Sequence, residues 1–422
     1  MRRMMLAGLL ALGVAPVSAQ AAAPSAEAVL KTYADIAHAG YEDSLITAKR
    51  LETAVDALIA LPSEKTLNDA KSAWRAARVP YQQTEAFRFG NPIVDEWEGK
   101  VNAWPLDEGL IDYVDSGKYG KSSDDNPYYT ANIVANPTLK LGGRTLETPK
   151  ITTAVIQELH ELDAVEANVT TGYHAIEFLL WGQDLNGTGP GAGNRPYTDF
   201  DTKNCTNGNC DRRAAYLEVA TDLLIADLEE MVANWDEGGA ARTQLMEAGD
   251  KGGLAMILTG MGSLSYGELA GERMKLGLLL HDPEEEHDCF SDNTHWSHYY
   301  DAQGVKNVYE GRYERVDGSV VEGASVSDLV AATDADLDKA ITGALNDTMA
   351  KMGKMADAAE AGEAYDQQIG EGNEAGNARV DAAITALLVQ TREIERAVAA
   401  LGLENLSIEG SDSLDNPAAV FQ

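Results

Sequence analysis

Residues 171–184 read Thr-Gly-Tyr-His-Ala-Ile-Glu-Phe-Leu-Leu-Trp-Gly-Gln-Asp, and this apolar run predicts the last turns of a buried helix. His174 and Glu177 are three residues apart, so a helix places both on one face, with Trp181 one turn further on. Gly172 has no side chain and permits another helix to approach closely. An imidazole and a carboxylate on an apolar face lose hydration energy unless both are bound. A metal ion would bind both, and a hydrogen-bonded structural histidine is the alternative interpretation.

Helical periodicity continues on both sides of this stretch. Apolar residues recur at steps of three and four over 25–61, 63–89, 149–183, 211–235, 251–280, 326–361 and 364–401. Two segments between them, 90–145 and 284–321, are irregular and rich in aromatic residues. Strand signals are nearly absent, and only 313–321 fits a small hairpin, around Asp317-Gly318. The sequence therefore predicts an all-α fold with at most a small hairpin.

The order of these segments predicts two helical-bundle domains. Each half contains helices, then an irregular aromatic-rich insert, then more helices, which is consistent with a duplication, although no residue-level repeat is evident. Residues 187–208 are rich in glycine and asparagine and mark the boundary. We assign 22–195 to an N-terminal helical domain and 211–403 to a C-terminal helical domain. Residues 404–422 form a polar tail that we expect to be loosely ordered.

The first 21 residues have the features of a signal peptide. A positive start, Met1-Arg2-Arg3, precedes an apolar run from Met4 to Val14 and a small-residue cleavage site, Ala19-Gln20-Ala21. The apolar run is too short for a stable membrane anchor. No cysteine stands near the cleavage site, so no lipoprotein attachment is evident. We therefore expect an exported, periplasmic protein.

The length and net charge of the chain restrict the kinds of partner that it can bind. The chain has 422 residues, of which 44% are hydrophobic, which is enough for a substantial core. Its 68 acidic and 33 basic residues give a formal net charge of -35. Repulsion from the phosphate backbone argues against a nucleic-acid partner. The charge is compatible with attraction of cations, although acidic surfaces also serve solubility.

Two of the three cysteines predict a disulfide. Cys205 and Cys210 flank the turn-forming tetrapeptide Thr-Asn-Gly-Asn, and in an oxidising compartment they should form a local bridge. Two thiolates alone make a poor zinc site. Cys289 is left over as a free thiol.

Several carboxylates are candidate ligands. Glu268 and Glu272 are four residues apart on an apolar helix, and they repel each other unless a cation or Arg273 lies between them. A solvated face is the alternative. Asp107 offers an oxygen ligand or a helix N-cap. Glu85 offers an oxygen ligand from its own helix.

One loop concentrates histidines. His287, His295 and His298 lie near Asp288 and Asp292, and such ligands suit iron, zinc or copper. Exposed loop histidines without a metal role are the alternative. The sequence has no nucleophile elbow, no phosphate-binding glycine loop and no His-Glu-x-x-His helix, so it lacks the common hydrolase and nucleotide motifs.

Taken together, these stretches resemble the imelysin family, and within it the iron-regulated protein A-like group. The family signature Gly-x-His-x-x-Glu matches Gly172-x-His174-x-x-Glu177. Supporting segments are Trp104-Pro105-Leu106-Asp107, Arg195-Pro196-Tyr197-Thr198-Asp199, Gly271-Glu272-Arg273-Met274 and Cys289-Phe290-Ser291-Asp292-Asn293-Thr294-His295. The resemblance covers nearly all of the chain after the signal peptide.

The resemblance implies two helical bundles with a shared site near their interface, and an exported protein linked to iron acquisition. On this basis we expect a metal ion or a small iron-containing ligand between the bundles, with iron as the cofactor and zinc or another divalent cation as the alternative. The expected metal ligands are His174, Glu177, Glu85, Asp107 and Glu268. Further candidate site residues are Gly172, Trp181, Glu272, Arg195, Asp292 and His295.

Two other functions remain open at this stage. A metallopeptidase needs three protein ligands, an open position and a base, whereas the sequence offers one clear His-x-x-Glu pair, so we lean against an enzyme. A cell-envelope interaction protein would use the same polar cluster for structure alone. An outer-membrane or periplasmic iron-transport protein is the partner that the resemblance implies, and the oligomeric state is left open.

Overall fold

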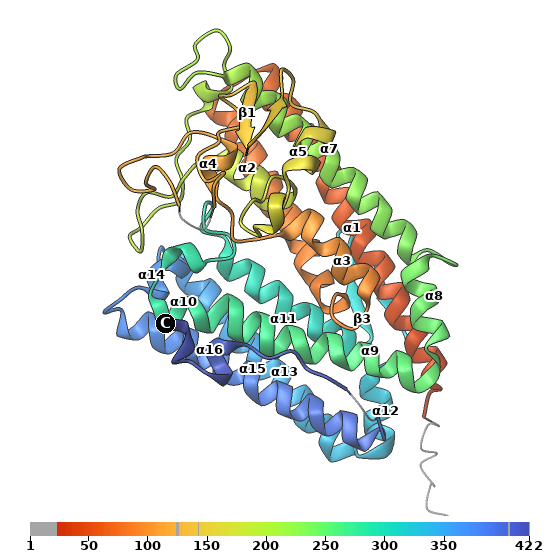
Figure 1. Ribbon diagram of the computed structural model, residues 1–422. Coiled ribbons are helices and arrows are strands. Elements are labelled where there is room, and N and C mark those ends of the chain that lie inside the picture. Colours follow the sequence, from red (N-terminus) through yellow and green to blue (C-terminus); the bar gives the residue numbers. More distant parts are fainter. Residues whose placement is uncertain (1–22, 124–125, 142, 404–405, 422) are drawn as a thin grey trace, which may run out of the picture.

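The computed structural model describes residues 23–123, 126–141, 143–403 and 406–421. The predicted signal peptide lies outside this part of the chain. Helices dominate the described residues (Figure 1), which confirms the predicted all-α class. The α-helices are α1 (Ala26–Ala60), α2 (Glu64–Thr84), α3 (Pro92–Asn102), α4 (Glu108–Ile111), α5 (Thr153–Leu159), α6 (Gly172–Trp181), α7 (Cys210–Trp235), α8 (Ala240–Glu247), α9 (Gly249–Ser263), α10 (Leu276–Leu280), α11 (Thr294–Glu310), α12 (Val326–Thr333), α13 (Ala335–Glu360), α14 (Tyr365–Ile369), α15 (Glu374–Ala400) and α16 (Asp412–Asp415).

The first two helices begin at serine caps. The Ser25 side chain accepts a hydrogen bond from the Ala28 N–H at the start of α1. Ser63 and Thr66 form a capping box at the start of α2, in which each side chain accepts from the other residue's backbone N–H. Pro80 lies inside α2 without ending it, and the helix continues into the 3₁₀ turn η1 (Glu85–Phe87).

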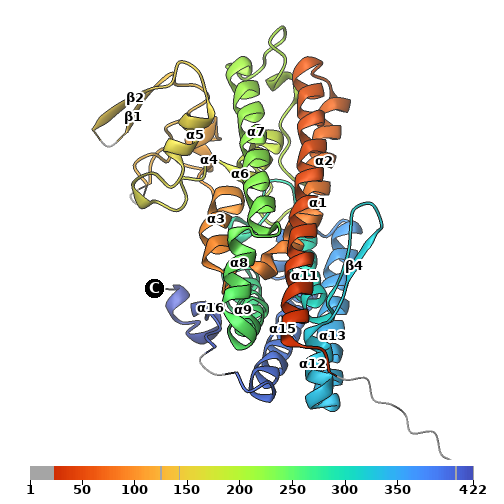
Figure 2. The same cartoon turned by 90° about the vertical axis from the view of Figure 1, so that its right-hand side faces the viewer.

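Two groups of packed helices make up the molecule. In the first bundle α1 packs against α2 and α7, and α6 fills the space beside α2 and α7. In the second bundle α13 packs against α11 and α15, and α15 packs against α9. Figure 2 shows α1, α2 and α7 side by side in its upper part and α12, α13 and α15 in its lower part. The main contact between the bundles is α2 against α11, and α1 also reaches α9.

Helix α7 lies in a different bundle from the one we expected. It begins after the predicted boundary at 195–211, yet it packs against α1 and α6 of the first bundle. Periodicity shows that a helix has an apolar face, but not which helix will cover that face. The change of packing partners therefore comes after Trp235, while the division into two domains itself stays a prediction.

The predicted helix at 251–280 forms as three successive segments. α9 runs into a π-helical segment, η4 (Leu264–Lys275), which runs into α10. Because a π-helix bonds residue i to residue i+5, it brings residues five apart close together. Arg273 accordingly donates from Nε to Glu268 Oε1 at 2.8 Å. The α-helical spacing that paired Glu268 with Glu272 does not apply here.

Two small antiparallel hairpins supply the strands of the described chain. β3 (Arg312–Glu314) and β4 (Val320–Glu322) pair with Tyr313 opposite Val321, as the sequence predicts. β1 (Thr138–Leu141) and β2 (Arg144–Glu147) form a second hairpin in the first insert, which the sequence analysis missed.

The described part of the C-terminal tail packs against the second bundle. A Cβ at Gly262 would lie 2.7 Å from the Ile408 side chain, and Ser413 is buried, so the described part of the tail packs on α9 and η4. The expectation of a loosely ordered tail is therefore wrong for residues 406–421.

Cys205 and Cys210 form the predicted disulfide, and Cys289 is a free, partly buried thiol. Within the described residues no helix combines the length and apolarity needed to cross a membrane.

Candidate functional site

Residues 172–177 lie at the start of α6, not in the last turns of a helix as predicted. Gly172 opens the helix with φ +79°, a conformation that L side chains rarely adopt. A Cβ at this position would lie 2.3 Å from the Val101 carbonyl oxygen of α3. The expected close approach of another helix is therefore present, and it fixes where α6 begins.

His174 and Glu177 contact each other, and both are buried. His174 Nδ1 lies 3.0 Å from Glu177 Oε2, and the Ser291 N–H donates to Glu177 Oε1 at 2.9 Å. With its hydrogen on Nδ1, His174 is held by Glu177 and keeps a free lone pair on Nε2, which has no other partner in the described chain. Glu177 therefore acts as the group that orients His174, since both of its oxygens are engaged.

A second histidine and a second carboxylate reach His174 from the segment between α10 and α11. The ligand atoms of His174, His287 and Asp288 all lie within 4.8 Å of one another. His174 is 2% exposed, His287 is 2% exposed and Asp288 is 0% exposed. Neither ring nitrogen of His287 has a hydrogen-bond partner among the described residues. We call His174, Glu177, His287 and Asp288 the His174 cluster.

Asp288 is anchored by several donors. Arg78 Nη2 donates to Oδ1 at 2.9 Å, Asn293 Nδ2 donates to Oδ2 at 2.9 Å, and the Ser297 hydroxyl also donates to Oδ2. Burial is the largest single influence and would raise the pKa of Asp288, but Arg78, His174 and the hydrogen bonds from Ser297 and Asn293 together hold that pKa below its usual value. A metal ion at this cluster would share the Asp288 carboxylate with the Arg78 guanidinium.

The electrostatics of the cluster favour neutral imidazoles. Burial, assisted by Arg78, lowers the pKa of His174 to about 3. Burial, followed by Arg273, lowers the pKa of His287 well below its usual value. Burial and the Asp288 carboxylate raise the pKa of Glu177 well above its usual value. A cation beside Glu177 would oppose that last shift.

Two of the expected ligands lie in a separate network around Arg273. Arg273 Nη2 donates to Glu85 Oε2 at 2.7 Å, and its Nη1 donates to Asp301 Oδ2 at 3.0 Å. The Nε of the same guanidinium donates to Glu268. We call these four residues the Arg273 network. Glu85 and Glu268 thus have a guanidinium as their positive partner, which is the alternative that the sequence left open for Glu268.

Asp107, unlike Glu85 and Glu268, shares a cavity with residues of the His174 cluster. It lines a cavity of about 280 Å³ together with His174, His287, Trp104 and other residues. Asn126 Nδ2 donates to its carboxylate at 2.5 Å. Asp107 also occupies the N-cap position of α4, but its side chain makes no capping bond there.

The remaining candidates have other surroundings. Arg195 is buried and donates to Asp112 at 2.8 Å and to Asp199 at 3.1 Å, so it belongs to a buried ion-pair group. Trp181 packs against Trp74 with ring centroids 5.3 Å apart. Glu272 is partly buried on η4. Asp292 and His295 line a second cavity, described below.

Sequence reasoning named His287 and Asp288 only as part of a loop cluster and did not connect them with His174. His287 and Asp288 reach His174 only because their loop folds back between the bundles. In the sequence, 110 or more residues separate this loop from the start of α6. Arg78 was missed altogether, because an arginine on an amphipathic helix gives no signal of burial.

Comparison with known proteins gives the family. A family model described as imelysin, Peptidase M75, matches residues 37–394. The chain belongs to the imelysin family. The matched range includes the His174 cluster and the Arg273 network.

Two relatives of this imelysin carry iron-related names. It is 38% identical over 64 residues to iron-regulated protein A of Synechococcus elongatus, a match that covers 15% of this chain and 18% of that protein. Its fold is similar to a crystal structure named as an iron-regulated protein A precursor from Parabacteroides distasonis, with a TM-score of 0.63 and 19% identity. That match covers 90% of this chain and 97% of the other, and at this identity it shows the fold alone.

Proposed function

We propose that this imelysin is an exported, periplasmic protein linked to iron acquisition, and that it binds a divalent metal ion, iron in the first place, between its bundles. His174, His287 and Asp288 supply the ligands, and Glu177 orients His174. The observation that carries the proposal is the convergence of these three side chains from distant segments to within 4.8 Å.

The donor set fits such an ion. Two imidazoles and one carboxylate suit Fe(II) and leave coordination positions open, and they suit Zn(II) as well. A ligating histidine commonly donates its other ring N–H to a carboxylate, which is the arrangement of His174 and Glu177. Buried ring nitrogens without partners on His174 and His287 are the atoms that a metal ion would bind. The names of the two relatives favour iron over zinc.

The hydrogen bonds made by the Glu177 carboxylate favour metal binding over peptide hydrolysis as the function. The cluster does offer a third ligand that the sequence did not identify, but a peptidase also needs a free base near an accessible substrate. Both Glu177 oxygens are already engaged, and the three ligand side chains are buried. The metallopeptidase therefore stays the second candidate.

The test is direct measurement of metal. Protein purified without chelators or affinity metal is analysed for bound metal, then stripped and titrated anaerobically with Fe(II) and separately with Zn(II). We expect the wild type to bind one ion, and His174→Ala and His287→Ala to lose it. Glu177→Gln should bind about 10–100-fold more weakly, because an amide cannot accept from both His174 and the Ser291 N–H.

A matched control is available in His281→Asn. His281 is partly buried, bonds the Ile369 carbonyl through Nδ1 and adopts a left-handed conformation that asparagine tolerates. This variant should bind metal as the wild type does. Equal binding by wild type, His174→Ala and His287→Ala would show the ligand assignment to be wrong. Loss of stability in those variants with unchanged metal content would favour a purely structural cluster.

A further inference from the structure

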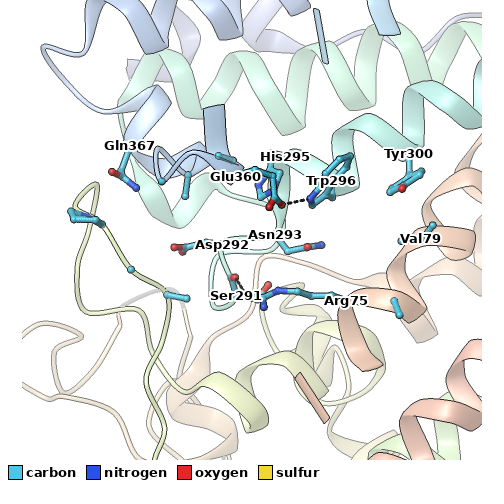
Figure 3. Close-up of a pocket in the computed structure, with 17 residues that line it drawn as sticks. Arg75, Val79, Ser291, Asp292, Asn293, His295, Trp296, Tyr300, Glu360 and Gln367 are labelled. Carbon is cyan, nitrogen blue, oxygen red and sulfur yellow. Dashed lines mark hydrogen bonds and ion pairs between the residues drawn. The ribbon is translucent and has the colours of Figure 1, made fainter. Parts of the chain in front are cut away.

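A second cavity, of about 630 Å³, is lined in part by residues 291–293, which follow Asp288 in the chain (Figure 3). Ser291 connects this cavity with the His174 cluster, because its N–H bonds Glu177 while the residue itself lines the cavity. Its walls come from α2, the 190–192 loop, the first turns of α11 and the end of α13. The volume is in the range of pockets that hold small organic molecules.

Buried polar atoms without partners line this cavity. His295 is 6% exposed, and neither of its ring nitrogens has a partner within hydrogen-bond distance in the described chain, since its Nε2 lies 3.8 Å from the carboxylate of Glu360, which also lines the cavity. Ser291 is 0% exposed, and its hydroxyl is also without a partner there. A buried donor or acceptor left unpaired costs free energy comparable to that of a lost hydrogen bond. Both side chains are therefore suited to bind a ligand in the cavity.

The lining of this cavity carries a positive side chain, Arg75, and a negative one, Asp292, at different places. Arg75 donates from Nη2 to the Ser291 carbonyl at 2.8 Å and leaves its other N–H groups available. Asp292 is separated from Arg75 in Figure 3. Burial, together with Asp366 and Asp184, raises the pKa of Asp292 to about 7, and the opposing effect of Arg75, which lowers this pKa, is smaller than each of these. A positive ligand group beside Asp292 would relieve this cost.

The remaining wall is aromatic. The Trp296 and Tyr300 rings stack with centroids 5.8 Å apart, and Val79 lies near them at the same end of the view (Figure 3). Trp296 is held in place by its Nε1–H bond to Glu360 at 2.9 Å. This wall suits a large apolar or aromatic group.

We propose that this cavity binds a zwitterionic ligand of the amino-acid class with a large side chain. Its carboxylate contacts Arg75, Ser291 and His295, its ammonium contacts Asp292, and its side chain packs on Trp296 and Tyr300. The site is distinct from the His174 cluster and needs no metal ion. Its failure would therefore leave the proposed metal function unaffected.

The test uses L-phenylalanine and its two end-blocked forms on metal-stripped protein, measured by calorimetry. N-acetyl-L-phenylalanine lacks the ammonium, and L-phenylalanine amide lacks the carboxylate. We expect L-phenylalanine to bind at least about 10-fold more tightly than either blocked form, because each charged contact is lost separately. Arg75→Met should weaken L-phenylalanine about 10-fold and leave the amide unchanged, whereas Asp292→Asn should weaken L-phenylalanine and leave the N-acetyl form unchanged.

Two control variants show whether an effect on binding comes from a lost contact with the ligand or from the change in the net charge of the protein. Lys71 lies over the Trp181 ring at 5.1 Å, as Arg75 does, but does not line the cavity, so Lys71→Met matches Arg75→Met. Asp222→Asn is the control for Asp292→Asn, because Asp222 is also an aspartate whose pKa burial raises, but it neither lines the cavity nor acts on Asp292. Both controls should bind L-phenylalanine as the wild type does. The proposal is overturned if L-phenylalanine binds no more tightly than about 1 mM, if a blocked form binds equally well, or if a control variant loses binding like its partner.

Discussion

At the scale of single residues, the interior is notable for histidines that lack hydrogen bonds. His298 is 0% exposed, neither of its ring nitrogens has a partner in the described chain, and its ring packs against Tyr365 with centroids 4.9 Å apart. Burial, followed by Arg273, lowers its pKa to about 3. A histidine in this state is an apolar packing element at neutral pH and an uncompensated charge in acid.

His298 should therefore make folding sensitive to acid. Its native pKa of about 3 lies below the ordinary value of 6.5, so the unfolded chain binds more protons between these values. The free energy of unfolding is then highest above pH 6.5 and decreases as pH falls toward 3, by up to about 1.4 kcal/mol per unit for this group. His298→Phe keeps the ring and should flatten the dependence between pH 6.5 and 4 in urea unfolding curves.

Tyr365→Phe supplies the control for this measurement, because it alters the ring that packs against His298 but removes no group that titrates between pH 6.5 and 4. This variant should keep the wild-type dependence on pH. Burial also lowers the pKa values of His174, His287 and His295, so part of the dependence should persist in His298→Phe, with a smaller slope than in the wild type. Identical slopes in wild type and His298→Phe would contradict the assignment.

At the scale of elements, helix starts and helix types position the site. α6 begins at Gly172 because only a residue without a Cβ fits both the positive φ and the contact with Val101. The π-helical geometry of η4 brings Arg273 next to Glu268, which an α-helix would not. Both features set which side chains meet between the bundles.

Gly172→Ala should destabilise the protein by roughly 2–4 kcal/mol, because left-handed strain adds to a clash with the backbone of α3. Gly187→Ala is the matched control, since Gly187 also has a positive φ, of +62°, but no atom within 4 Å of an added Cβ. That variant should lose about 1 kcal/mol from strain alone. Equal losses in urea unfolding would show that the contact with Val101 is not what requires glycine.

At the scale of the whole molecule, a buried polar layer lies where the bundles meet. The Arg273 network joins η1, which follows α2 of the first bundle, to η4 and α11 of the second. Arg78 of α2 likewise holds Asp288 of the segment before α11. Each cation compensates a carboxylate from outside its own bundle, Glu85 for Arg273 and Asp288 for Arg78, so removal of one partner leaves a buried charge unpaired.

Arg273→Met should test this layer. The substitution keeps an unbranched apolar chain but leaves Glu85, Glu268 and Asp301 without their guanidinium, and we expect a loss of about 3–5 kcal/mol in the free energy of unfolding. Arg396→Met is the control, because Arg396 pairs with Glu393 at the surface and should change stability by at most about 0.5 kcal/mol. Similar losses for the two variants would show that the network contributes no more than a surface ion pair.

The sequence by itself determined the all-α class, most of the long helices, the disulfide and the hairpin at 313–321. It did not find α3 and α11, which lie in the two segments predicted to be irregular, and it joined α5 and α6 into one helix. The correct predictions depend on local patterns: apolar spacing, turn residues and a short cysteine loop. The resemblance to the imelysins was also readable from ordered local motifs. None of these signals requires knowledge of which segments meet.

Only the tertiary structure decided which polar groups share a site. Glu85, Glu268 and Asp107 were all candidate ligands in the sequence, because spacing alone does not show which positive partner a carboxylate meets in the fold. The fold placed Glu85 and Glu268 against Arg273, and it placed His287 and Asp288 against His174. The physical reason is that compensation of a buried charge is a long-range requirement, met by whichever segment the packing of the bundles brings within a few ångströms.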